Sequence, residues 1–112
     1  MSEYVHAAIL VTGLEAVDEV VTEARKQALS LQLNPTELVH GRNGYSSFMV
    51  PPSGAGSLHI SNDLHRTQRW AFTQWLKDFG VRLEWVEVTF GREFGPAMVT
   101  DDCSRRELKA VS

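Results

Sequence analysis

The amino-acid sequence predicts an α+β domain of the ferredoxin-like (split βαβ) class, with two helices on one face of an antiparallel sheet of four to five strands. Two segments repeat apolar residues every three or four positions, which is typical of helices that lie on a sheet. Four other segments are rich in β-branched and aromatic residues, as strands are. Asn43-Gly44, between two of these strand segments, is a strong hairpin signal, because both positions tolerate positive φ. The predicted element order is therefore β-α-β-β-α-β.

The first strand is predicted at residues 4–12, where both faces are mostly apolar, as in a central strand that is covered on one side and partly on the other. A helix is predicted at residues 14–31. Thr12 and Glu15 have the spacing of a capping box, in which both side chains accept hydrogen bonds from N–H groups at a helix start. Asn34-Pro35 is expected to end the helix. Its apolar seam comprises Leu14, Val17, Val21, Ala24, Ala28 and Leu31.

The middle of the chain predicts a hairpin, with strands at residues 37–40 and 45–50 around the turn Gly41–Gly44. Pro51-Pro52 is expected to end the second strand, because proline lacks the N–H that a strand ladder needs. A helix that ends at residue 79 should follow. Its candidate N-caps are Ser61, Asn62 and Asp63, and its candidate C-terminal glycine is Gly80.

A further strand is predicted at residues 81–90. Its alternation of apolar and polar residues slips by one between Trp85 and Val86, which indicates a bulge or a change of sheet face. Residues 97–100 are a candidate edge strand. The prediction is one domain at residues 1–100 and a polar, flexible tail at residues 101–112.

The composition favours one ordinary globular domain. The chain has 112 residues, of which 43% are apolar and 22% are charged. Its formal net charge of −3 lacks the basic character of a nucleic-acid binder, so no nucleic acid is expected as a partner. Cys103 is the single cysteine, which excludes an internal disulfide and suits a reducing cytoplasm. The N-terminal apolar stretch is shorter than the roughly 20 residues that span a bilayer, so a cytoplasmic, non-membrane protein is predicted.

Three stretches carry a resemblance to other sequences. Residues 44–54 read GYSSFMVPPSG, residues 69–76 read RWAFTQWL and residues 85–91 read WVEVTFG. Together they resemble small uncharacterised proteins encoded by bacteriophages and prophages, whose typical pattern is GYxSFxxPDGS, then FxxWL, then WVEVxxG. Residues 52–57 depart from this pattern, since a Lys-Glu pair and a tryptophan are missing there. The resemblance implies a phage or prophage accessory origin and no defined activity.

Two clusters are candidate ligand sites. The loop containing Ser53, Gly54, Gly56 and Ser57 could hold a phosphate through backbone N–H groups, but it lacks the third glycine of a dinucleotide fingerprint and the Lys-Ser/Thr of a P-loop. A metal site at His59, Asp63 and His65 is disfavoured, because the histidines lack helical i, i+4 spacing. No cofactor and no metal are predicted.

Catalytic groups are equally sparse. His6 could act as a general acid or base, but the sequence shows no orienting partner. Glu84 and Glu87 have unequal strand parity and should not share a site unless the bulge realigns them. Cys103 near Arg105 lacks the rigid pocket of a nucleophile. The sequence therefore predicts a protein that is not an enzyme.

Trp70 is the strongest functional signal. Wound as a helix, Gln68, Phe72, Trp75, Leu76 and Phe79 share one face. Trp70 lies about 160° from Phe72, beside Arg66, Thr73 and Lys77. Either the loop at residues 51–60 covers the indole, or a partner protein binds it.

The leading hypothesis is a small non-enzymatic protein-interaction module that binds and modulates a host protein or complex, with Arg66, Trp70, Thr73 and Lys77 at the interface. The alternative is a small-ligand or nucleotide-binding module that uses the loop at residues 53–57 and the sheet face bearing Tyr4 and His6. A homodimer through a sheet edge is a further possibility.

Overall fold

The structure is a computed structural model that describes residues 6–14, 19–52, 60–79, 82–92 and 95–104, with only the backbone described at residues 60–66. Its elements in chain order are β1 (His6–Leu14), α2 (Val20–Ser30), β2 (Val39–His40), the 3₁₀ turn η1 (Arg42–Gly44), β3 (Tyr45–Val50), α3 (Ile60–Phe79), β4 (Leu83–Phe90) and β5 (Met98–Asp102). The strands form one sheet in the order β2-β3-β1-β4-β5, and every neighbouring pair is antiparallel. These elements confirm the predicted α+β fold with two helices and a five-stranded antiparallel sheet.

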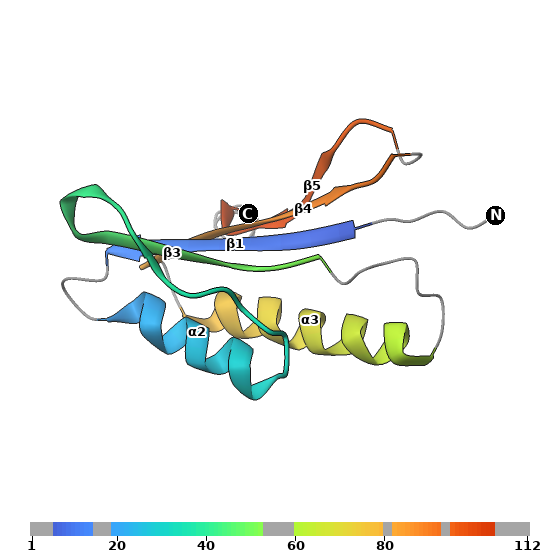
Figure 1. Ribbon diagram of the computed structural model, residues 1–112, viewed down its shortest axis with the longest axis horizontal. Helices are drawn as coiled ribbons and strands as arrows, with labels where there is room; N and C mark the ends of the chain where they lie inside the picture. Colours follow the sequence, from blue (N-terminus) through green and yellow to red (C-terminus); the bar gives the residue numbers. More distant parts are fainter. Residues whose placement is uncertain (1–5, 15–18, 53–59, 80–81, 93–94, 105–112) are drawn as a thin grey trace, which may run out of the picture.

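Both helices lie on the same side of the sheet (Figure 1). Alternate strand residues point to opposite faces, so the register divides the sheet into a helix face and an open face. The helix face carries side chains that are at most 4% exposed, namely Ile9, Val11, Phe48, Val50, Leu83 and Trp85. Helix α2 packs Val21, Ala24 and Ala28 into this layer, and α3 adds Phe72 and Leu76. The ring of Phe72 lies 6.5 Å from that of Phe48, which joins α3 to the middle of the sheet.

The predicted start of the first helix was wrong, because Thr12 and Leu14 belong to β1. The Thr12 hydroxyl donates to the Ser46 carbonyl oxygen at 3.0 Å and accepts from the Ser47 hydroxyl at 2.9 Å. The strand pairs with β3 and β4 on its two sides, and these ladders replace the predicted capping box. Glu15 and Val17 lie outside the described residues.

Helix α2 begins at Val20 and ends at Ser30, earlier than the predicted end. The chain then passes through left-handed conformations at Gln32 (φ 63°) and Asn34 (φ 58°), which turn it back toward the sheet. Leu33 is buried between them, so this reversal contributes to the core.

The hairpin prediction was confirmed. Asn43 (φ 60°) and Gly44 (φ 80°) adopt the positive φ values that made this pair a turn signal. The Gly41 N–H donates to the Tyr45 carbonyl oxygen at 2.7 Å and closes the turn. Strand β2 is shorter than predicted, whereas β3 has the predicted bounds.

Helix α3 begins at Ile60, so Ser61, Asn62 and Asp63 lie in its first turn rather than at its N-cap. The helix ends at Phe79, as predicted, while Gly80 lies outside the described residues.

Strand β4 contains a register irregularity, but it lies between Glu87 and Val88 and affects the ladder with β5. The sequence placed it two residues earlier. Strand β5 runs to Asp102, past the predicted domain boundary at residue 100, and residues 105–112 are outside the described part.

Candidate protein interaction surfaces

Trp70 is exposed on α3. Its exposed fraction is 64%, although Arg69 and Phe72 beside it in sequence are buried. The described residues therefore leave the indole largely accessible, and the predicted cover by the loop at residues 51–60 falls mostly outside the described part of the chain. Residues 53–59, which include the predicted ligand-loop residues Ser53, Gly54, Gly56 and Ser57, lie outside the described residues.

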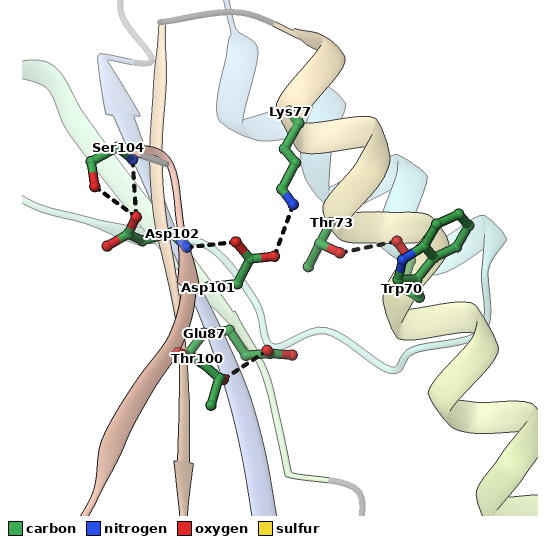
Figure 2. Close-up of polar contacts among 8 residues, drawn as sticks. All are labelled: Trp70, Thr73, Lys77, Glu87, Thr100, Asp101, Asp102 and Ser104. Atoms are coloured by element: carbon green, nitrogen blue, oxygen red, sulfur yellow. Dashed lines mark hydrogen bonds and ion pairs between the residues drawn. The ribbon is translucent and has the colours of Figure 1, made fainter. Parts of the chain in front are cut away.

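The predicted cluster around Trp70 does not form a single exposed surface. Thr73 is buried, and its hydroxyl donates to the Trp70 carbonyl oxygen at 3.0 Å (Figure 2). Lys77 points toward β5, where its Nζ lies 3.0 Å from Asp101 Oδ2 and both side chains are mostly buried. Both assignments to an exposed interface were therefore wrong. The side chain of Arg66 is outside the described residues.

Lys77 points away from the surface around Trp70 because β5 widens the sheet under this flank of α3. Asp101 is the cross-strand partner of Glu87, and Glu87 is the partner of Ile9, so both acids lie on the helix face. The Thr100 hydroxyl donates to Glu87 Oε1 at 2.8 Å and lies 2.9 Å from the Thr89 hydroxyl. We call Lys77, Glu87, Thr100 and Asp101 the polar seam. The sequence interpretation missed it because it began the tail at residue 101.

The two glutamates that looked like a pair in the sequence, Glu84 and Glu87, lie on opposite faces of the sheet. Glu84 is the cross-strand partner of Thr12, which places it on the open face, opposite to Glu87. The bulge does not realign them. They therefore cannot act on one substrate as an acid–base pair, which agrees with the expectation from strand parity.

Arg69 is a buried charge that the sequence interpretation overlooked. Its guanidinium donates to the Pro51 carbonyl oxygen at 3.1 Å and also to the carbonyl oxygen of Ala7. Burial lowers the pKa of Arg69, and the nearby Glu87 carboxylate partly opposes this effect. Its i, i+3, i+7 spacing with Phe72 and Leu76 was the signal that could have placed it on the buried face.

Two histidines, His6 and His40, have surroundings that bear on a catalytic role. The His6 ring lies 5.3 Å from that of Phe90, and its Nδ1 is buried without a hydrogen-bond partner among the described residues. His40 Nδ1 lies 2.8 Å from the Ser46 hydroxyl oxygen, a contact that resembles a nucleophile–base pair. Ser46 is only 2% exposed, however, so its hydroxyl cannot reach a substrate.

The candidate metal ligands and the Cys103 thiol also lack the surroundings of a reactive site among the described residues. Within the described part of the chain, no group of three or more His, Cys, Asp or Glu residues could hold a metal ion. His59 lies outside the described residues, and only the backbone of Asp63 and His65 is described. Cys103 packs partly against the core, and its N–H donates to the Trp85 carbonyl oxygen at 3.2 Å. Next to Cys103, the Asp102 carboxylate accepts hydrogen bonds from the Ser104 N–H and hydroxyl (Figure 2).

The open face is the second candidate surface. Each of the five strands presents an apolar side chain there that is 36–65% exposed, and together these are Val39, Tyr45, Leu10, Leu14, Phe90 and Val99. A polar row of Ser47, Thr12 and Glu84 crosses the same face between Leu10 and Leu14. Exposed apolar side chains rimmed by polar residues are typical of an interaction surface. In the sequence, both faces of β1 are mostly apolar. This pattern was interpreted as a strand whose second face is partly covered.

Neither helix in the described residues combines the length and apolar character needed to cross a membrane. Comparison of the chain with protein-family models, curated proteins and solved structures found no match. The resemblance to phage and prophage proteins therefore stays a prediction from the three sequence stretches.

Proposed function

We propose that the protein is a small non-enzymatic interaction module, of phage or prophage accessory origin, that binds and modulates a host protein or complex in the host cytoplasm. The observation that carries the proposal is the 64% exposure of Trp70 on a turn of α3 where Arg69, Phe72 and Thr73 are buried. Tryptophan is the residue type most enriched at the energetic centres of protein interfaces, because a large ring is desolvated by the partner.

The surroundings of Trp70 support this role. The Thr73 hydroxyl binds the Trp70 carbonyl oxygen, and the buried Arg69 and Phe72 fix the same turn of α3 to the sheet. A side chain on a fixed backbone loses less conformational entropy on binding than one on a mobile loop. The acidic net charge and the lack of an accessible catalytic set among the described residues favour a protein partner over nucleic acid or a substrate.

For the fold, we further propose the ferredoxin-like class. The strand order β2-β3-β1-β4 and the placement of both helices on one face support it. Strand β5 is then an addition at the edge next to β4.

The test is affinity capture of host proteins by the tagged chain, followed by mass spectrometry. Trp70→Ala should weaken binding of the captured partner by more than about 1 kcal/mol without unfolding the domain. Leu29→Ala is the matched control, because Leu29 is an exposed apolar residue on the other helix. Equal binding by wild type and Trp70→Ala, or the absence of any stoichiometric partner, would reject the proposal.

A further inference from the structure

The open face requires a separate explanation, because Trp70 lies on the helix layer and not on this face. From its shape, composition and charges we infer that the open face binds the open face of a second copy of this chain. The protein would then be a dimer of two stacked sheets with its helices outside. This inference goes beyond the proposed function and does not depend on it.

The size of the open face suits a weak dimer. The five strands hold 30 residues in all, and each residue covers about 4.8 Å by 3.3 Å of the sheet. The flat area is therefore roughly 480 Å², below the roughly 800 Å² that each partner contributes to a standard protein interface. Interfaces of this smaller size are found in weak complexes, so we expect a dimer that dissociates on dilution.

The centre of the open face is free of charge. Strand β1, in the middle of the sheet, contains no Asp, Glu, Lys or Arg from His6 to Leu14. In a twofold dimer each residue near the axis meets its own counterpart, so a charged residue there would face a like charge. Leu10 and Leu14 on this strand would instead meet apolar groups.

The charges away from the centre are complementary under the same symmetry. Glu84 lies on the open face at the start of β4, on one side of β1, and it is exposed. On the other side of β1, Arg42 is exposed in the turn and residues 38–50 contain no acidic residue, while His40 pairs with the buried Ser46 and lies on the helix face. A twofold axis parallel to β1 reverses the strand order of the second sheet, so β4 of one copy lies over β3 of the other. It also brings Glu84 to the sheet end where the Arg42 turn joins β3, which favours this orientation.

The helices would lie on the two outer layers of such a dimer, because they cover the opposite face of each sheet (Figure 1). Each outer layer would carry one copy of Trp70. A dimer could therefore present two binding sites to a partner assembly, which raises avidity without any new contact.

The test is sedimentation equilibrium of the full chain over a wide concentration range. We expect a species of about 25 kDa, twice the chain mass of 12.5 kDa. Leu10→Lys should raise the dimer dissociation constant at least about 100-fold, because it places two like charges at the centre of the interface. Leu29→Lys is the matched control, because Leu29 on α2 is 48% exposed and Leu10 is 50% exposed, and it should leave the dimer intact.

Circular dichroism identifies a variant that fails to fold, and Tyr45→Glu on β3 then replaces Leu10→Lys with the same expected result, because it places a carboxylate near Glu84 of the other copy. A wild-type chain that stays monomeric at its solubility limit would overturn the inference. So would a dimer that Leu10→Lys leaves intact, or one that Leu29→Lys disrupts equally. None of these results affects the test of Trp70, which is read from partner capture.

Discussion

The two faces of the sheet are made by the same five strands, yet they differ sharply in exposure. On the helix face, Phe48 and Trp85 are at most 4% exposed, whereas on the open face Val39 is 65% and Tyr45 is 44% exposed. Both faces carry large apolar side chains. Burial, and not residue type, therefore distinguishes them, so the folded monomer uses only part of the apolar surface that its sequence provides.

The largest effect is expected from a matched pair of phenylalanines. Phe48→Ala on the helix face should lower the free energy of unfolding by about 3–5 kcal/mol, because it leaves a cavity in the core. Phe90→Ala on the open face should cost at most about 1–2 kcal/mol, because solvent already reaches its ring. Urea denaturation of dilute protein measures both values without a contribution from association. Equal losses would show that the open face is packed in solution.

A smaller effect is expected from the buried guanidinium of the helix layer. Arg69→Met keeps most of the apolar stem but leaves the carbonyl oxygens of Ala7 and Pro51 without their donor. The expected loss in the free energy of unfolding is about 1–3 kcal/mol. Arg42→Met, at an exposed arginine of the hairpin turn, is the control and should change stability by less than about 0.5 kcal/mol. A stability gain in Arg69→Met would mean that desolvation of the charge outweighs its hydrogen bonds.

The smallest effect concerns the polar seam, where the helix layer meets the edge strand. A double-mutant cycle with Lys77→Met and Asp101→Asn should give a coupling free energy of about 0.2–1 kcal/mol, because the ion pair remains partly solvated. The coupling should shrink as salt is added. A coupling that salt does not change would contradict the assignment of this contact as a partly solvated ion pair.

Much of the fold followed from local signals. The hairpin was predicted because Asn43-Gly44 determines its own conformation, and the end of α3 followed from helical periodicity. The start of α2 was not predictable in this way. Thr12 has capping chemistry, but it joins β3 and β4 through ladders with residues far away in sequence.

The candidate surfaces show the same limit. Helical winding placed Trp70 away from Phe72, and the indole is indeed exposed. The winding could not show that β5 would lie under the flank of α3 and engage Lys77, because that contact depends on a strand predicted to end at residue 100. The open face was predicted only as the site of the alternative ligand-binding function, since apolar patterning cannot tell which side of a strand the helices will cover.

The two outermost strands, β2 and β5, limit how the sheet can be extended sideways. One border, β2, is only two residues long, and the other, β5, has an irregular register opposite Glu87 and Val88 and ends in Asp101 and Asp102. Short, irregular or charged borders resist the addition of foreign strands. Lateral growth of the described sheet by strand addition is therefore disfavoured at both borders.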